Sequence, residues 1–368
     1  MQSKQDAIGL IPVFSVIILA IGLMNHVMVL PPLLKEAGRD AWISVLSVIV
    51  PYLAWTAILF GIMRITNQQP IVAWLRARYG RAAGWTLRIV FILYLFVMCS
   101  LTLKDTVLWT QSSYLPRTPR IALSLSLMFL CGMAVHYGLR AIAVTSGILL
   151  PFVIVFGDFV MSANLPVKQY SLLSPILVRG WDPVLRGGLY IGGGLSELIV
   201  LLLIQHRLKK KVRLWSICVL ALFLILLIFG PVTGAIAEFG PAEAAMLRYP
   251  AYEEWRLVRI GKYIRHVDFL SIYQWLSGAF VRISFTVYLL LDLLTFRQAS
   301  KKGNLLWLAA LCALTVILVE LPISDMRYLA FLKHVYLPCS LWGATAVLAV
   351  LFVLAWIRKP LEKESYEN

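Results

Sequence analysis

Long apolar stretches alternate with short polar ones along nearly the whole chain, and this pattern predicts a protein built from membrane-spanning helices. A helix of about 20 apolar residues crosses the roughly 30 Å of hydrocarbon in a bilayer. Ten stretches approach or exceed that length: residues 9–34, 41–63, 84–113, 119–138, 141–162, 184–206, 213–234, 268–294, 304–321 and 335–357. The first is too long for a signal peptide and no small-residue cleavage site follows it, so we expect it to be retained.

Composition and charge support this interpretation. Of the 368 residues, 60% are hydrophobic types and 14% are charged, and the mean hydropathy is +0.82. The net charge of +16 does not indicate a nucleic-acid partner, because the basic residues collect in alternate loops instead of forming a stripe. These loops, around residues 64–88, 140, 207–213 and 297–302, contain no acid. The positive-inside rule therefore predicts a multi-pass protein with these loops and both termini on the cytoplasmic side.

The first and sixth apolar stretches both contain poor helix formers near their middle. The first reads VIILAIGLMNHVMVLPPLL and the sixth reads GGLYIGGGLSELIVLLLIQ. Each begins a run of five spans, and five is an odd number, so the two runs must have opposite orientations in the bilayer. The pattern predicts an all-α integral membrane protein with ten transmembrane helices in a 5+5 inverted repeat, in which helices 1 and 6 are discontinuous.

We expect one transmembrane domain over residues 1–368. Its first repeat covers about 7–163 and its second about 184–357. Residues 235–268 are expected to form an extracytoplasmic loop and residues 358–368 a cytoplasmic tail. The mixed charge and aromatic residues of the loop fit a lid, a docking site for a partner, or a short interfacial helix.

Paired helix breaks at the membrane midplane typically expose backbone groups to a ligand. Three consecutive glycines favour unwinding, since each lowers helix propensity by about 1 kcal/mol relative to alanine, although glycines also allow close helix packing. We expect N–H groups released in helix 1 to bind a carboxylate, and carbonyls in helix 6, with an adjacent acid, to bind an amine. The ligand-binding residues predicted on these helices are Ile21, Gly22, Leu23, Met24, Asn25, Gly192, Gly193, Gly194, Ser196 and Glu197.

Residues of other spans complete the predicted ligand-binding site. Glu197 is the deepest acid and Arg282 lies halfway along span eight. A charge at that depth requires compensation, so we favour a pair between the two, with direct binding of a ligand by either as the alternative. Tyr94 and Met98 share one face of span three and form either a pocket wall or ordinary helix packing. Ser284 is the remaining predicted ligand-binding residue.

No motif in the chain indicates an enzyme. There is no HExxH, Walker A or GxSxG pattern, and neither the five histidines nor the five cysteines have metal-ligand spacing. We therefore expect no catalytic activity, metal or cofactor, and we expect the cysteines to serve packing. Lys104 and Asp105, near the outer end of span three, are expected to form an exposed pair.

Two stretches next to the spans resemble a known family. Residues 29–44 read VLPPLLKEAGRDAWIS and residues 249–275 read YPAYEEWRLVRIGKYIRHVDFLSIYQW. With these stretches, its length, its ten spans and its glycine-rich sixth span, the chain resembles the GerB-type spore germination permeases, the B subunits of spore germinant receptors. This family belongs to the amino acid–polyamine–organocation (APC) transporter superfamily, so the resemblance implies a LeuT/APC-like fold.

The resemblance also implies a function. It predicts a germinant-sensing subunit in the inner membrane of a bacterial spore, which binds a small nutrient, expected to be an amino acid, at the membrane midplane. The partners it implies are a germinant receptor A subunit and a lipoprotein C subunit. The alternative is a proton- or sodium-coupled amino acid transporter of the same superfamily.

Overall fold

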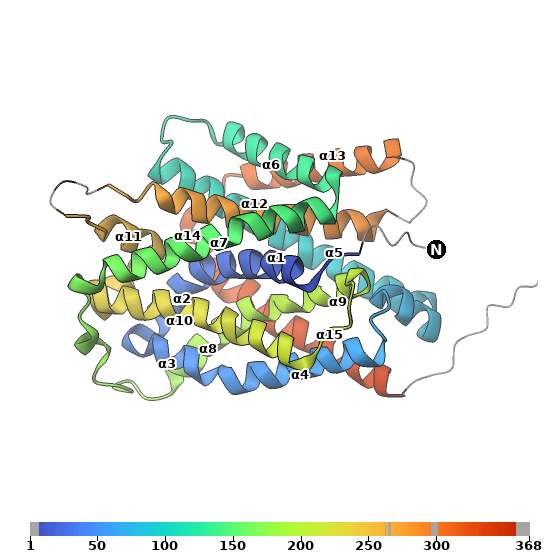
Figure 1. The fold of residues 1–368 in the computed structure, drawn as a ribbon, viewed down its shortest axis with the longest axis horizontal. Helices are drawn as coiled ribbons and strands as arrows, with labels where there is room; N and C mark the ends of the chain where they lie inside the picture. Colours follow the sequence, from blue (N-terminus) through green and yellow to red (C-terminus); the bar gives the residue numbers. More distant parts are fainter. Residues whose placement is uncertain (1–6, 262, 264–265, 296–300, 358–368) are drawn as a thin grey trace, which may run out of the picture.

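The computed structural model describes residues 7–261, 263, 266–295 and 301–357. Helices run roughly along the long axis of the molecule (Figure 1). The described residues contain no strand, and Ile8 and Leu208 form an isolated bridge. The α-helices are α1 (Leu10–Leu23), α2 (Leu30–Ala37), α3 (Ala41–Ser47), α4 (Ile49–Ile65), α5 (Ile71–Ser113), α6 (Arg120–Tyr137), α7 (Leu139–Ala163), α8 (Asp182–Leu195), α9 (Leu201–Ile204), α10 (Leu214–Ala244), α11 (Pro250–Leu257), α12 (Leu270–Leu294), α13 (Lys301–Glu320), α14 (Asp325–Phe331) and α15 (Leu337–Ile357). The π- and 3-10 segments are η2 (Met24–Val29), η3 (Gly38–Asp40), η4 (Leu165–Val167), η5 (Tyr170–Leu173), η6 (Ser196–Val200), η7 (Gln205–Arg207) and η8 (Leu332–Tyr336).

The described residues contain nine helical stretches that are long and apolar enough to cross a membrane. They coincide with nine of the ten predicted spans, which confirms a helical, multi-pass membrane protein. The predicted span 41–63 differs. Its first residues form α3, which continues from the first stretch, and the remainder lies in α4, an apolar helix of 17 residues.

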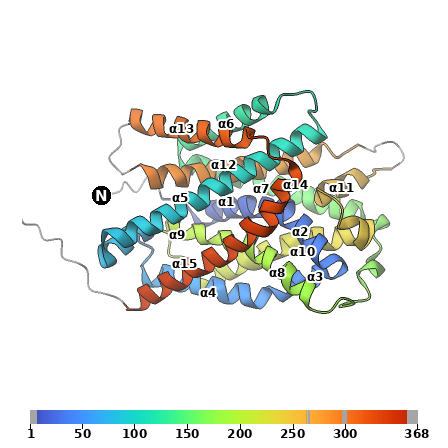
Figure 2. The same ribbon diagram turned by 180° about the vertical axis from the view of Figure 1, so that it is seen from behind.

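The two stretches with predicted breaks occupy the centre of the bundle. In both Leu10–Ser47 and Asp182–Arg207, 83% of the most apolar window is buried, against 22% for α6 and 28% for Gly303–Glu320 in α13. Helix α1 runs through the middle of the molecule in Figure 1, and the view from behind in Figure 2 shows α15 beside α8. Helix α12 packs against α1, α5, α6 and α7. The buried faces of α1, α8 and α12 therefore offer positions where a polar group contacts protein instead of lipid.

Both central helices change their winding at residues within the predicted breaks, but both stay helical there. Helix α1 stays regular through Leu23, and the π-helical η2 begins at Met24, whose N–H donates to the carbonyls of Ala20 and Ile21. The prediction of free N–H groups in this stretch was therefore wrong, because a π turn shifts hydrogen bonds by one residue without breaking the helix. In the sixth span the 3-10 segment η6 starts at Ser196.

The three glycines of the sixth span are helical, so the prediction of unwound backbone there was wrong. They serve close packing. A Cβ at Gly193 would overlap the main-chain carbonyl of Leu337 in α15, and one at Gly194 would overlap the side chain of Asn25. At Gly192 it would lie 3.0 Å from Leu341. These glycines let α15 and η2 approach the backbone of α8.

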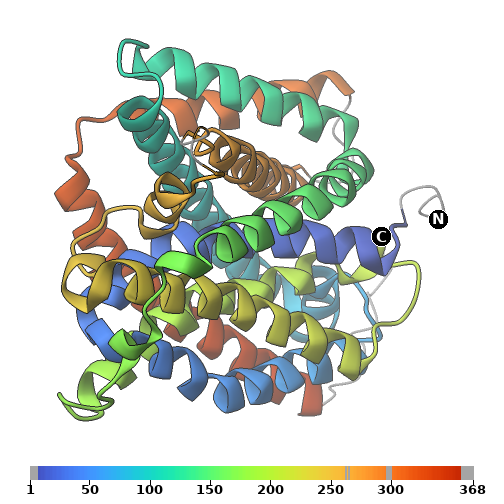
Figure 3. The same ribbon diagram turned by 60° about the vertical axis from the view of Figure 1, so that its left-hand side comes forward.

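Helix α11 packs onto the end of the bundle that comes forward in Figure 3. The Trp255 side chain lies in a small apolar cluster with Val160 of α7 and donates a hydrogen bond to Gln274 of α12 (2.8 Å). The amide of Asn164 donates to the carbonyl of Glu254 (2.8 Å). The predicted loop thus begins with a continuation of α10 to Ala244, followed by the docked helix α11.

Candidate functional site

A buried ion pair joins η6 of the sixth span to α12. Glu197 of η6 and Arg282 of α12 are both fully buried, and the Arg282 guanidinium donates two hydrogen bonds to the carboxylate, Nη1 to Oε2 at 2.5 Å and Nη2 to Oε1 at 2.6 Å. Such a two-point contact fixes both distance and orientation. The structure thus contains the internal pair that we favoured on grounds of charge compensation.

The remaining donors and acceptors of the pair connect it to three further elements. Arg282 Nε donates to Thr102 Oγ1 of α5 (2.8 Å), and Nη1 also donates to the carbonyl of Ala20 in α1 (2.9 Å). Tyr336 of η8 donates its hydroxyl hydrogen to Glu197 Oε1 (2.8 Å). A buried pair is tolerated only when further hydrogen bonds satisfy both ions, and here α1, α5 and η8 supply them.

A second polar cluster surrounds the hydroxyl of Ser340 in α15. That hydroxyl donates to the carbonyl of Gly193 (2.9 Å) and lies within hydrogen-bond distance of the hydroxyls of Tyr94 (2.9 Å) and Ser196 (3.1 Å). The Tyr94 ring is parallel to that of Tyr336, with centroids 6.4 Å apart. Tyr94 and Ser196 are both predicted site residues, and both contact Ser340. The ring of Tyr336, which bonds Glu197, connects this cluster to the ion pair.

Among the predicted site residues next to the ion pair, Asn25 has a polar side chain without a hydrogen-bond partner. It is fully buried in η2, and neither its amide nitrogen nor its oxygen has a hydrogen-bond partner among the described residues. It lies against Gly194, three residues before Glu197. An unsatisfied buried amide costs on the order of 1–3 kcal/mol, so a ligand or water that satisfies it gains that stabilisation.

Most of the other predicted residues pack around the ion pair, and one, Ser284, lies away from it. Ile21, Gly22, Leu23, Met24 and Met98 lie in the apolar packing around the pair, where Leu23 contacts Gly278 and Gly22 faces Leu227. Thr102 donates to the carbonyl of Met98 (2.7 Å). Ser284 is buried on α12, but it lies two residues from Arg282, about 200° around the helix. The structure does not bring Ser284 to the pair.

Thr102, Tyr336 and Ser340 contribute to the site but were not among the predicted ligand-binding residues. Their sequence signal is weak but present. Thr102 lies four residues after Met98, a predicted site residue, and therefore on the same helix face. Tyr336 and Ser340 are also four residues apart, and two hydroxyl groups on one face of an otherwise apolar span indicate that this face is turned toward protein.

A large open cavity of about 1010 Å³ lies at the end of the bundle covered by α11. Arg248 lies on its wall and ties two helices together, with Nη2 donating to Asp105 of α5 (2.6 Å) and Nε to Asp325 of α14 (2.9 Å). Burial lowers the pKa of Arg248, but the charge of Asp105 and the hydrogen bond to Asp325 outweigh it and raise that pKa overall. The expectation of an exposed Lys104–Asp105 pair was wrong, because Lys104 donates to two carbonyls at the end of α13, Val319 and Leu321.

Stacked aromatic rings lie next to this outer cavity. Trp109 of α5 and Trp275 of α12 are parallel with centroids 4.0 Å apart, and Tyr249 and Tyr252, which line the cavity, contact them edge-on. On α5, Trp109 is seven residues beyond Thr102, a rise of about 10 Å. The rings therefore lie about two helical turns from the contact between Thr102 and Arg282.

Comparison with known proteins supports a single assignment. The protein family described as "Spore germination protein" matches residues 10–326. The chain is 42% identical to "Spore germination protein XB" of Bacillus anthracis over 344 residues, which covers 94% of this chain and 96% of that protein. It is 25% identical to "Putative spore germination protein YfkT" of Bacillus subtilis (strain 168) over 283 residues, or 76% of each. The chain therefore belongs to the spore germination protein family of GerB-type permeases.

Proposed function

We propose that this protein is the germinant-sensing B subunit of a spore nutrient receptor and binds a small nutrient, an amino acid, at the Glu197–Arg282 pair. The observation that carries the proposal is the pair itself, two opposite charges buried between η6 of the sixth span and α12. The ligand's carboxylate takes the place of Glu197 on Arg282, and its ammonium group binds Glu197. Family membership supports a germination role.

In this proposal the spans form the ten-helix 5+5 repeat, with α4 counted as the second span. Both termini are cytoplasmic, and the bilayer is the inner membrane of the spore. The start of α1 and the end of α15 lie at the same end of the bundle (Figure 1), next to the basic loops, which agrees with this orientation. The signal passes to an A subunit and a lipoprotein C subunit.

Asn25 offers the sharpest test, because it has no partner to lose. Asn25→Ala is expected to leave stability unchanged or raise it, since removing an unsatisfied buried polar group is neutral or favourable. If the amide binds the nutrient, the same substitution raises the nutrient concentration that half-activates germination by about tenfold. Spores of a strain that lacks the native gene and carries each variant are exposed to single amino acids, sugars and nucleosides, and loss of refractility is followed.

The matched control for the pair is another ion pair, near the C-terminal end of α12. Asp292 accepts a hydrogen bond from Arg207 (2.6 Å) and is 39% exposed. We expect Glu197→Gln to abolish the response and Asp292→Asn to leave the dose–response curve unchanged, with protein levels in spores measured for both. An unchanged half-activating concentration in Asn25→Ala, or equal effects of the two acid-to-amide variants, contradicts binding at this site.

Counterflow of labelled amino acids in liposomes separates the sensor from the alternative, a proton- or sodium-coupled transporter. A sensor binds the ligand without net exchange. Saturable counterflow that Glu197→Gln removes assigns the site to transport instead.

A further inference from the structure

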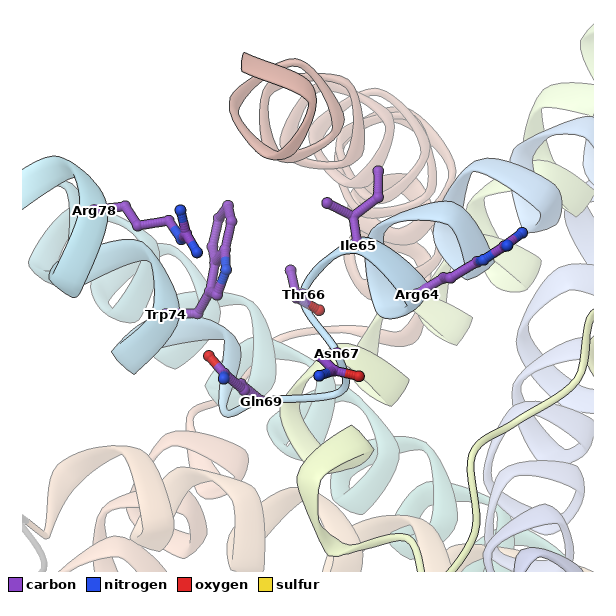
Figure 4. A pocket seen from close by; sticks show the side chains of 7 residues that line it. All are labelled: Arg64, Ile65, Thr66, Asn67, Gln69, Trp74 and Arg78. Atoms are coloured by element: carbon purple, nitrogen blue, oxygen red, sulfur yellow. The ribbon is translucent and has the colours of Figure 1, made fainter. Parts of the chain in front are cut away.

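A second pocket, of about 300 Å³, lies at the basic end of the bundle, where α4 ends and α5 begins. Its walls are formed by Arg64, Ile65, Thr66, Asn67, Gln69, Trp74 and Arg78 (Figure 4). Polar donors predominate, and no carboxylate is present among these lining residues. Because α5 runs from this pocket to the aromatic rings and the outer cavity, the pocket is remote from the Glu197–Arg282 site.

The sequence around this pocket is basic. Between Asp40 and Asp105 the chain contains five arginines, Arg64, Arg76, Arg78, Arg81 and Arg88, and no acid. Arg78 stacks over the ring of Trp74, with its guanidinium carbon 5.4 Å from the ring centroid. In Figure 4 the Arg78 guanidinium turns toward Trp74, whereas Arg64 extends away from it at the rim. Basic pockets between membrane helices are typical sites for anionic headgroups.

The backbone adds to the attraction for an anion. Helix α5 starts at Ile71, and its first turn borders the pocket through Trp74, whose N–H bonds to the carbonyl of Pro70 (2.9 Å). The N–H groups that precede Trp74 in this turn have no intrahelical acceptor, and the helix dipole is positive there. The N-terminus of α5 thus borders a pocket that is lined by two arginine side chains, and both features favour an anion.

The pocket wall is held in place by contacts with the neighbouring basic loop. Lys211 Nζ donates to Asn67 Oδ1 (2.8 Å), and Gln205 Nε2 donates to the carbonyl of Gln69 (2.7 Å). Asn67 adopts a left-handed backbone conformation, with φ of 54°. The connection between α4 and α5 is therefore built into the fold.

An apolar surface for lipid tails adjoins the pocket. Tyr79 of α5 donates to the carbonyl of Leu354 in α15 (2.6 Å), which holds the end of α15 beside residues 71–79 of α5, before the kink at Gly80. Along this end of α15, Val350, Val353 and Trp356 are 54–73% exposed. A ligand with a phosphate in the pocket and acyl chains along α15 satisfies both surfaces, whereas a soluble phosphate ester leaves the apolar surface unused.

We propose that this pocket binds the phosphate of an anionic phospholipid headgroup, a role independent of nutrient binding at the Glu197–Arg282 pair. Phosphatidylglycerol is the probe. The purified full chain in detergent is titrated with phosphatidylglycerol, phosphatidylcholine, glycerol 3-phosphate and inorganic phosphate. Lipid retention is measured by native mass spectrometry and stability by the thermal unfolding midpoint.

We expect saturable retention of phosphatidylglycerol, with a raised unfolding midpoint, and no such effect of phosphatidylcholine. Arg78→Gln is expected to weaken retention about tenfold, because it removes a charge-assisted contact. Asn67→Asp provides a second test, since it places a negative charge on the wall while preserving the contact with Lys211. Arg81→Gln, an equal charge change at an exposed residue outside the pocket, is the control.

Two results overturn the proposal. Equal loss of retention in Arg78→Gln and Arg81→Gln shows that the lipid follows overall surface charge and not the pocket. Binding of glycerol 3-phosphate or inorganic phosphate with the affinity of phosphatidylglycerol identifies a soluble phosphate as the ligand and excludes the role of the α15 surface.

Discussion

Replacing Glu197 with glutamine is expected to destabilise the folded protein more than any conservative substitution elsewhere in the chain. The carboxylate accepts three hydrogen bonds, two from Arg282 and one from Tyr336, at a position with no exposure. The amide keeps the shape but has a single acceptor, so its NH2 group faces a donor and the Arg282 charge loses its counterion. Removing one member of a buried pair typically costs about 3–5 kcal/mol. This corresponds to a change of roughly 150-fold to 4,000-fold in the unfolding equilibrium, at about 1.4 kcal/mol per factor of ten.

A double-mutant cycle isolates the pair from the surrounding packing. Arg282→Met alone leaves Glu197 uncompensated and is expected to cost a similar amount, whereas the double variant removes both charges and recovers at least about 2 kcal/mol of the summed loss. Equilibrium unfolding in mixed micelles of detergent and denaturing surfactant measures all four proteins. Additive effects of the two substitutions refute the reasoning, since they show that the charges do not interact. A loss below about 1 kcal/mol in either single variant also refutes it, because it indicates solvated groups.

Three further predictions concern single contacts. Tyr336→Phe removes the hydroxyl bonded to Glu197 and should lower the free energy of unfolding by about 1.5–3 kcal/mol, measured in the same micelles. Gly193→Ala places a methyl group against a main-chain carbonyl of α15 and should cost about 1–3 kcal/mol, whereas Gly147→Ala, with open space at the Cβ position, should not lower the unfolding midpoint. Burial, with repulsion from a neighbouring acid, raises the pKa of Glu254 well above its ordinary value of 4.5. The stability due to this group is therefore present at acid pH and lost as the pH rises through the folded-state value. Thermal unfolding at a series of pH values should show a flatter profile for Glu254→Gln, and an unchanged slope contradicts the assignment.

The spans and the ion pair follow from simple physical limits, which is why the sequence predicts them well. An apolar run is either long enough to cross the bilayer or too short. Both ends of α12 and the start of α10 lie within two residues of the predicted segments. The pairing of Glu197 with Arg282 follows because two buried charges of opposite sign are far less costly together than apart. Neither conclusion requires knowledge of how the helices pack.

The glycines and hydroxyl groups depend on that packing, and the sequence alone does not settle them. A run of three glycines is equally compatible with an open helix and with a helix approached closely by a neighbour. The distinction rests on α15, whose Leu337 carbonyl lies where a side chain of Gly193 would be. Tyr336 was not predicted as a site residue for the same reason, because only the tertiary fold brings η8 to Glu197. We expected Asp105 to be exposed because its partner, Arg248, lies 143 residues later in the chain and only the tertiary fold brings the two together.

In the proposed sensing mechanism, the hydrogen bonds that Arg282 already makes explain why a zwitterion is preferred to an acid without an amino group. Four hydrogen bonds use four of the five N–H donors of the guanidinium, two of them on Glu197. A ligand carboxylate can make a two-point contact with Arg282 only if Glu197 leaves it, so ligand binding and separation of η6 from α12 are the same event in this mechanism. A zwitterion then compensates both buried charges, whereas an acid without an amino group leaves Glu197 unpaired at a cost of several kcal/mol. Deaminated analogues should therefore fail to trigger germination at concentrations at least a hundredfold above those of the amino acid, at about 1.4 kcal/mol per factor of ten. A ligand can shift the helix arrangement only by its difference in affinity for the two states, and exchange at the pair provides that difference.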